Sequence, residues 1–373
     1  MITSMPRRAA LPARKIIPLI AFGLMALSAI PVNLAFLRAE QAARTALNPT
    51  IERLTKGKVA DALTIAYNAS SPFKDAGINL FGSLSFLAFH ELRSGAQMGS
   101  TGWIFSNEEF ETSATSRVMI DKALAHVSDV QKRLAARDIA LIVAPLPLKA
   151  DIENAYLGGT QLGAELTSRY AYVQTALKAA GISTVDLKAA FLLGRINRPV
   201  FLRTDTHWTP DGARVTAETI AKAAAVFNLP GEKSFVLTHD LARAHDGDLL
   251  KFVRLFPALA NIGPGMEMIE PVTAASAEAG DLFAEVALPV TLVGTSYSAN
   301  AVFGFEAQLK AALKRDVLNV SEEGKGPFAP MRAYLSSDAY RNTPPKLVIW
   351  EMPIRYLDDV FPAADMSLPN ELP

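Results

Sequence analysis

The chain has 373 residues, and its 37 lysines and arginines balance its 37 aspartates and glutamates, so the formal net charge is zero. A nucleic-acid binder usually carries a basic excess, so the balanced charge sets that class aside. The sequence contains no cysteine, which excludes thiolate zinc sites, a cysteine nucleophile and disulfide bonds.

The first predicted element is an uncharged apolar run over 16–37, which follows four basic residues between positions 7 and 15. A helix of that length spans roughly 30 Å, enough to cross a bilayer. The positive flank is expected to stay in the cytoplasm and to send the remaining chain outward. We therefore predict a cytoplasmic tail over 1–15 and a single-pass signal anchor in the inner membrane over 16–37. A cleaved signal peptide is the alternative.

Residues 38–100 carry helix and loop signals without chemistry, and we expect a stalk that leads into the main domain. From residue 101 the pattern alternates between helix and strand. Apolar residues at spacings of three and four predict an amphipathic helix over 116–137. The apolar run over 139–145 predicts a strand buried on both faces. Further helices are predicted over 166–180, 210–227 and 301–315, and further strands over 182–187, 199–203, 290–294, 317–321 and 346–352.

Strands that alternate with helices predict an α/β domain over 101–361, with a mostly parallel sheet flanked by helices. Residues of about 228–288 interrupt the alternation with several glycines and prolines and few strand signals. We interpret them as an insertion. Residues 362–373 are expected to form a C-terminal tail.

Polar residues follow two of the predicted strands, at the sheet edge where ligands bind in such folds. Thr-Asp-Thr-His-Trp follows the strand over 199–203, and Thr-Ser-Tyr-Ser follows the strand over 290–294. Asp205 and His207 are two residues apart, so an extended backbone points both side chains the same way. Together with Ser296 in a strand-to-helix turn, they provide an orienting acid, a general base and a nucleophile. The alternative is a purely structural role, in which Ser296 only caps the following helix.

Several strings resemble the periplasmic alginate O-acetyltransferase family, which belongs to the SGNH hydrolase-like superfamily. The main ones are LRTDTHWTPDGA over 202–213, LVGTSYSAN over 292–300 and NVSEEGKGP over 319–327. Four others are similar to further blocks of the family: TGWIFSNEEF (101–110), VAPLPLKADI (143–152), GDLLKF (247–252) and IWEMPIRYL (349–357). The resemblance implies an SGNH-like, flavodoxin-like fold in which the Asp/His block precedes the serine block, a permuted order.

By this resemblance Asp205, His207 and Ser296 form a catalytic triad that acetylates a bacterial exopolysaccharide, alginate-like or cellulose-like, through an acetyl-serine. Gly324 or Gly326 would contribute a backbone N–H to the oxyanion hole. No cofactor is expected, because a membrane-bound O-acyltransferase partner would deliver the acetyl groups. Two alternatives remain: a carbohydrate acetyl-esterase that uses the same triad, and a non-catalytic scaffold of a polysaccharide export complex.

Other residues near the predicted strand ends have two interpretations. Trp208 and Tyr297 could stack on a sugar ring or pack in the core. Lys149 and Arg355 could bind an anionic polymer or be ordinary surface charges. The histidines of the insertion lie near Asp248, but their spacing does not match a zinc site. We therefore expect a solvated polar loop there and predict no metal.

Overall fold

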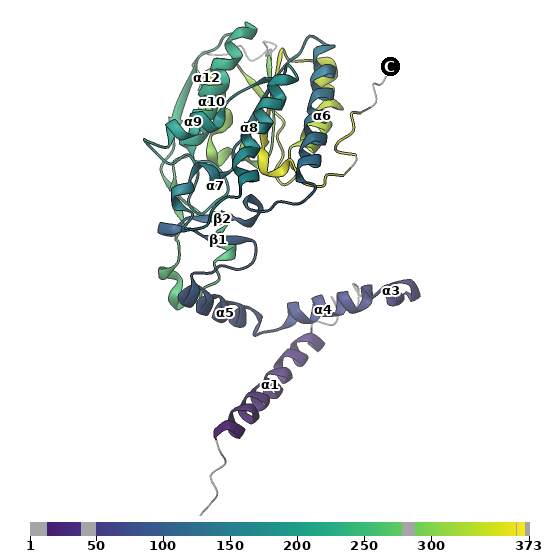
Figure 1. Cartoon of the computed structure of the whole chain (residues 1–373), viewed down its shortest axis with the longest axis vertical. Coiled ribbons are helices and arrows are strands. Elements are labelled where there is room, and N and C mark those ends of the chain that lie inside the picture. Colours follow the sequence, from purple (N-terminus) through teal and green to yellow (C-terminus); the bar gives the residue numbers. More distant parts are fainter. Residues whose placement is uncertain (1–12, 39–49, 278–287, 363, 370–373) are drawn as a thin grey trace, which may run out of the picture. The chain divides into compact units, whose positions relative to one another are not determined.

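The computed structural model describes residues 13–38, 50–277, 288–362 and 364–369 (Figure 1). The chain divides into two compact units. The first comprises Met1–Ala88 with Arg254–Ala258, and the second comprises Phe89–Val253 with Leu259–Pro373. The second unit begins before residue 101, because the strand β1 (Ala96–Met98) pairs antiparallel with β2 (Ile104–Ser106).

The first unit is helical, with α1 (Ala13–Arg38), α3 (Ile51–Thr55), α4 (Lys58–Ser70) and most of α5 (Lys74–Phe89). The predicted anchor falls on α1, but the side chains of 13–21, 24, 25 and 37 lie outside the described residues. Within the part of the chain that the structure describes, we find no helix that combines the length and the apolar character needed to cross a membrane.

The second unit is built on a sheet of five parallel strands in the order β10-β9-β11-β3-β4. The strands are β3 (Ala140–Leu146), β4 (Ser183–Thr184), β9 (Val290–Val293), β10 (Val317–Asn319) and β11 (Leu347–Pro353). If the strands are numbered from β9, so that β9, β10, β11, β3 and β4 become 1 to 5, the order is 2-1-3-4-5. This is the flavodoxin-like strand order in a chain that starts at a different strand. The strand order reverses between β9 and β11, and ligands bind at such a switch point, outside the carboxyl ends of the strands. The predicted parallel α/β sheet is thus confirmed.

Helices cover both faces of this sheet, because its strands are apolar on both sides. Along β3, Ile142 and Ala144 join one hydrophobic core, whereas Leu141 and Val143 join the other. The first core contains α9 (Leu187–Gly194), α10 (Pro210–Ala224) and α12 (Phe305–Leu313), which Figure 1 shows grouped together. The second contains α6 (Ser116–Ala135), α8 (Ala164–Ala179), α13 (Phe328–Leu335) and α14 (Asp338–Asn342). Each fully buried apolar side chain stabilises the fold by about 1.5–3 kcal/mol.

The remaining short elements lie in this unit, except that the first two residues of η6 belong to the first unit. They are η1 (Ser100–Gly102), η2 (Asn107–Glu109), α7 (Lys149–Ile152), η3 (Asn154–Tyr156), η4 (Ala225–Phe227), η5 (Leu250–Phe252), η6 (Pro257–Ile262), α11 (Ser296–Ala299), η7 (Ala301–Phe303) and η8 (Ile354–Tyr356). The predicted insertion holds two antiparallel pairs, β5 (Phe235–His239) with β8 (Val272–Ser276) and β6 (Arg243–His245) with β7 (Glu267–Ile269).

Two strand predictions were wrong in detail. The run over 199–203 does not join the sheet but folds back on itself in a hairpin, with a single antiparallel bridge between Phe201 and Trp208. Within the hairpin the Leu202 amide donates to the His207 carbonyl at 3.0 Å, whereas the Arg203 carbonyl accepts from the Ile104 amide and the Arg203 amide donates to Glu267. The strand over 182–187 shrinks to β4, because the Asp186 carboxylate accepts a bond from the Ala189 amide and starts α9.

Candidate active site

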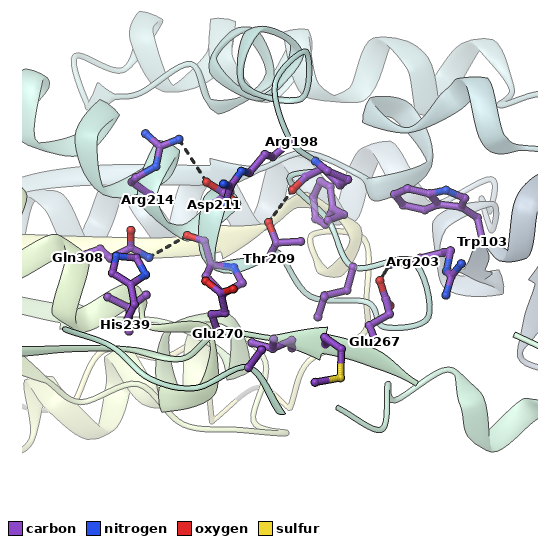
Figure 2. A pocket seen from close by; sticks show the side chains of 18 of the residues that line it. Trp103, Arg198, Arg203, Thr209, Asp211, Arg214, His239, Glu267, Glu270 and Gln308 are labelled. Atoms are coloured by element: carbon purple, nitrogen blue, oxygen red, sulfur yellow. Dashed lines mark hydrogen bonds and ion pairs between the residues drawn. The ribbon is translucent and has the colours of Figure 1, made fainter. Parts of the chain in front are cut away.

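A cavity of about 600 Å³ opens beside the 200–209 hairpin (Figure 2). Neither Ser296 nor His207 lines it. Three arginines and three carboxylates line it, so its charge is balanced, and Asp211 pairs with Arg198 at 3.4 Å and with Arg214 at 3.5 Å. This cavity therefore does not select an anionic polymer by charge, and the reactive side chains lie elsewhere.

The candidate nucleophile lies at the carboxyl end of β9, beside the switch point of the sheet. Thr295 is the N-cap of α11, and Ser296 is its first residue. The carboxylate of Glu351, on the neighbouring strand β11, is fully buried and accepts bonds from the Thr295 amide at 2.8 Å and from the Ser298 hydroxyl at 3.0 Å. Burial raises the pKa of Glu351, and these hydrogen bonds oppose the rise. The buried carboxylate thereby fixes the turn that presents Ser296.

Gly294 allows the turn to sit this close to Glu351. A Cβ atom at position 294 would lie 2.5 Å from the Glu351 Oε2 atom and 2.8 Å from the Ser298 hydroxyl oxygen. Contacts below 3.0 Å force something to move. Only glycine therefore fits without displacing the buried carboxylate.

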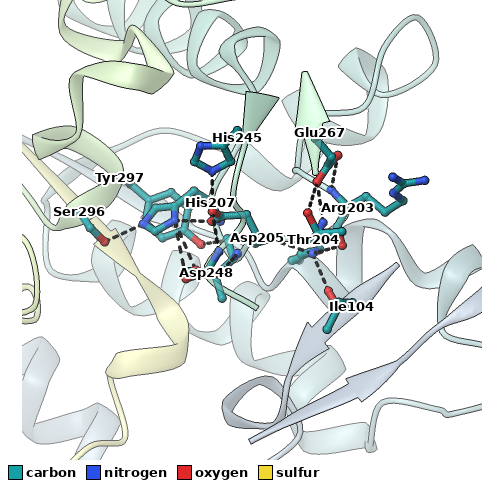
Figure 3. Close-up of polar contacts among 12 residues, drawn as sticks. Ile104, Arg203, Thr204, Asp205, His207, His245, Asp248, Glu267, Ser296 and Tyr297 are labelled. Carbon is teal, nitrogen blue, oxygen red and sulfur yellow. Dashed lines mark hydrogen bonds and ion pairs between the residues drawn. The ribbon is translucent and has the colours of Figure 1, made fainter. Parts of the chain in front are cut away.

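The candidate base is His207, on the returning arm of the 200–209 hairpin (Figure 3). Its Nε2 atom lies 2.7 Å from the Ser296 Oγ atom, and its Nδ1 atom lies 2.6 Å from the Asp205 Oδ1 atom. The imidazole stacks on the Phe303 ring at 4.8 Å and contacts the Tyr297 ring at 4.6 Å. These contacts fix the ring between nucleophile and carboxylate. The structure thus brings the three predicted triad residues together.

The candidate orienting acid, Asp205, has partners on both carboxylate oxygens. Its Oδ1 atom accepts from the His207 ring and from the His207 amide at 2.9 Å. Its Oδ2 atom contacts His245 Nε2 at 2.8 Å and accepts from the Asp248 amide at 3.0 Å. Burial raises the pKa of this carboxyl, but the bonds from His207 and His245 outweigh it and hold the pKa well below its usual range. Asp205 is therefore an anion suited to stabilise a charged His207.

The insertion supplies residues that the sequence analysis missed. The Asp248 carboxylate accepts from the Thr206 amide at 2.8 Å and from its hydroxyl at 2.6 Å, and Glu267 binds the Thr204 amide at 2.6 Å (Figure 3). The loop packs closely on this segment, because a Cβ at Gly247 would lie 2.3 Å from the Thr204 carbonyl oxygen. The prediction of a solvated loop was therefore wrong for His245 and Asp248, which contact Asp205 and Thr206, whereas His239 is exposed. The string GDLLKF, which contains Asp248, was the available signal.

One set of described residues has ligand atoms close enough to share an ion. Atoms of Asp205, His207 and Asp248 all lie within 4.8 Å of one another. His207 Nδ1 is already 2.6 Å from the Asp205 carboxylate, and the Asp248 carboxylate already holds Thr206. These contacts form a hydrogen-bond network that orients His207.

All four side chains for which binding to a sugar or polymer was one of two interpretations are buried. Trp208 is fully buried, and the Tyr297 hydroxyl donates to the Thr206 carbonyl at 2.5 Å. The Lys149 ammonium donates to the carbonyls of Ile104, Arg203 and Asp205 at 2.6, 3.2 and 2.8 Å. Burial lowers the pKa of Lys149 to about 8, against the attraction of nearby carboxylates. Trp208 and Tyr297 belong to the core, and Lys149 supports the loop that carries Asp205.

Three predicted site residues remain: Arg355, Gly324 and Gly326. In the described part of the chain, none of them is hydrogen-bonded to a triad residue. Arg355 is also mostly buried; its guanidinium donates to the Tyr356 hydroxyl at 2.8 Å and lies 4.7 Å from that ring. Gly324 and Gly326 adopt positive φ angles of 69° and 65° in the turn after β10. Among the described residues, no hydrogen bond joins either glycine to the triad.

Comparison with known proteins gives a consistent result. Residues 96–354 match the family model described as SGNH hydrolase-like domain, acetyltransferase AlgX. The protein named "Probable alginate O-acetylase AlgJ" of Pseudomonas putida is 37% identical over 311 residues, which cover 82% of this chain and 81% of that protein. Its namesake in Pseudomonas aeruginosa is 37% identical over 318 residues, with the same coverage of 82% and 81%.

Solved structures share the fold. The O-acetyltransferase domain of Pseudomonas putida AlgJ superposes with a TM-score of 0.66 at 34% identity, covering 71% of this chain and 92% of that domain. Pseudomonas aeruginosa AlgX superposes with a TM-score of 0.56 at 22% identity, covering 70% of this chain and 66% of that one. The second likeness speaks for the fold alone.

Proposed function

Because this chain belongs to the family of SGNH hydrolase-like acetyltransferase domains, we propose that it acetylates hydroxyl groups of an alginate-like exopolysaccharide. Relatives at 37% identity that are named as alginate O-acetylases support alginate as the polymer. A cellulose-like glycan is the second polymer class. The observation that carries the proposal is the unbroken chain of contacts at 2.6 and 2.7 Å from Asp205 through His207 to the Ser296 hydroxyl.

In the proposed reaction, His207 Nε2 accepts the proton of Ser296 while the Ser296 oxygen attacks an acetyl carbonyl. His207 then gives this proton to the leaving group, and an acetyl-serine remains. A sugar hydroxyl attacks the acetyl-serine, with His207 again accepting the proton and returning it to the Ser296 oxygen. Asp205 stabilises the imidazolium in both steps.

The oxyanion of each step needs donors near Ser296. The amides in the first turn of a helix have no intrahelical acceptor, so the Ser296 N–H is available. We propose that a glycine amide of the turn after β10, at Gly324 or Gly326, is the second donor.

The acetyl donor is proposed to be a membrane-bound O-acyltransferase partner, with no diffusible cofactor on this chain. We further propose that the run over 16–37 anchors the chain in the inner membrane and that the triad works in the periplasm. The support is the uncharged run with basic residues on its N-terminal side. Extraction of membranes at alkaline pH tests the anchor: an anchored chain stays in the pellet, and release into the supernatant would contradict it.

The function is tested by incubating the purified full chain with an activated acetyl ester, with and without an oligomannuronate. We expect acetylated oligosaccharide from the wild type and none from Ser296→Ala, with equal melting temperatures. Ser336→Ala, which removes an exposed hydroxyl at the end of α13, is the matched control and should retain full activity. Acetate release that ignores the sugar would identify an esterase instead. Equal activity in wild type and Ser296→Ala would refute the triad.

A further inference from the structure

The insertion carries a second histidine that contacts the triad. His245 ends β6, and its Nε2 atom lies 2.8 Å from Asp205 Oδ2, the oxygen that His207 does not use (Figure 3). Its ring also packs edge-on against Phe303 at 5.8 Å, and Phe303 stacks on the His207 ring. One carboxylate therefore lies between two imidazoles, one from the hairpin and one from the insertion.

We propose that His245 is a positioning residue for acetyl transfer, which fixes the orientation of Asp205 and through it the tautomer and aim of His207. The proposal rests on the proposed function of the triad. It extends the machinery from three residues to four, with the order His245, Asp205, His207 and Ser296.

The geometry of Asp205 explains why a second donor matters. The terminal torsion of an aspartate is broad, so the donors on its two oxygens determine how firmly the carboxylate is oriented. Here the His245 ring and the Asp248 amide hold Oδ2 while His207 holds Oδ1. The Asp205 side chain is 3% exposed, so water can replace a lost donor only with difficulty. Without His245, the Asp248 amide is the one remaining donor to Oδ2, so we expect the carboxylate to be less firmly oriented.

The charges around His245 predict a pH effect. The carboxylates of Asp205, Asp248 and Glu267 face it, and His207 lies across Asp205. The hydrogen bond to Asp205 raises the pKa of His245 against the effect of burial, so its charged form persists to higher pH than in a free histidine. A charged His245 partly neutralises the Asp205 carboxylate, so this carboxylate stabilises the His207 imidazolium less. Transfer should therefore quicken as rising pH removes this proton.

Two substitutions of His245 distinguish the effect of its hydrogen-bond donor from the effect of its positive charge. His245→Phe keeps a ring against Phe303 but removes the N–H group, and we expect kcat to fall roughly tenfold to a hundredfold with KM little changed. His245→Gln keeps an N–H donor of similar reach without the charge, and should recover most of kcat. The acid limb of its pH profile should fall in a single step, whereas the wild type shows two coupled steps. His239→Phe, on the exposed end of β5, is the control and should match the wild type.

The measurements use the full chain, with kcat and KM for an acetyl ester across the range in which histidines titrate. A second readout is the proton NMR signal of the hydrogen-bonded His207 Nδ1–H. It should persist in His245→Gln and broaden or vanish in His245→Phe. Wild-type kcat in His245→Phe, or an equal loss in His245→Gln, would overturn the proposal. If the wild type transferred no acetyl, the proposed function would fail, and the NMR signal would still decide whether His245 positions His207.

Discussion

Gly294→Ala tests whether the buried carboxylate of Glu351 fixes the nucleophile. The new methyl carbon would lie 2.5 Å from Glu351 Oε2, so this oxygen must retreat by about 0.9 Å to reach an ordinary separation of 3.4 Å. Glu351 cannot retreat freely, because it is fully buried and holds both Thr295 and Ser298. The shift must therefore pass into the turn that carries Ser296.

Two magnitudes follow from this displacement. A misplacement of about 1 Å in a catalytic group costs on the order of a hundredfold in rate, so we expect kcat of Gly294→Ala to fall by about that factor. Overpacking a well-filled site costs about 1–3 kcal/mol of folding free energy. The variant should therefore remain folded at room temperature with a lowered melting temperature.

The assay is acetyl transfer from an activated ester, with thermal unfolding measured on the same samples. Gly265→Ala is the matched control, since a Cβ there meets nothing within 4 Å and its φ is not in the left-handed region. The control should match the wild type in both measurements. If Gly294→Ala kept wild-type kcat, Glu351 would not be the residue that positions the nucleophile.

Three further predictions concern the surroundings of the triad. Asp205→Asn should lower kcat about 10⁴-fold with the fold intact, because an amide favours the wrong tautomer of His207; a loss below tenfold in the ester assay would contradict this. Tyr297→Phe should lower the free energy of unfolding by about 1–3 kcal/mol, because it leaves the buried Thr206 carbonyl without this donor; unchanged urea unfolding would refute it. The pKa of Lys149 is about 8 in the folded chain and 10.5 in the reference state, so the unfolded chain binds more protons between these values. Wild-type stability relative to Lys149→Met should therefore rise by about 3 kcal/mol as pH climbs through this window, and a constant difference would rule it out.

The parts of the fold that the sequence predicted are those that local pattern determines. The helix α6 follows the spacing of its buried residues Ile120, Val127 and Val130. The helix α10 begins at a proline after the capping residue Thr209. Both α10 and the apolar strands β3 and β11 could be recognised from short windows, because their burial repeats along the segment.

The missed parts depend on contacts between distant segments. The run over 199–203 has the composition of a strand, but its backbone bonds go to its own hairpin, to Ile104 and to Glu267 instead of the five-stranded sheet. His245 lies 40 residues from Asp205 along the chain, and no periodicity reports that contact. For Trp208 and Lys149 the sequence left two interpretations open, because the burial of a single side chain cannot be determined from its neighbours in sequence. The contact between Ser296 and His207 was expected from the permuted motif order. The donors to Asp205 from the insertion, the His245 ring and the Asp248 amide, were not expected.

The central claim is that Ser296 carries the acetyl group. It is tested most directly by quenching the full chain with acid during turnover of an activated acetyl ester and mapping the modified peptide by mass spectrometry. The account predicts one acetyl group on Ser296, absent in Ser296→Ala and slow to form in Asp205→Asn. Acetyl found on another residue, or product formed at the wild-type rate by Ser296→Ala, would contradict it.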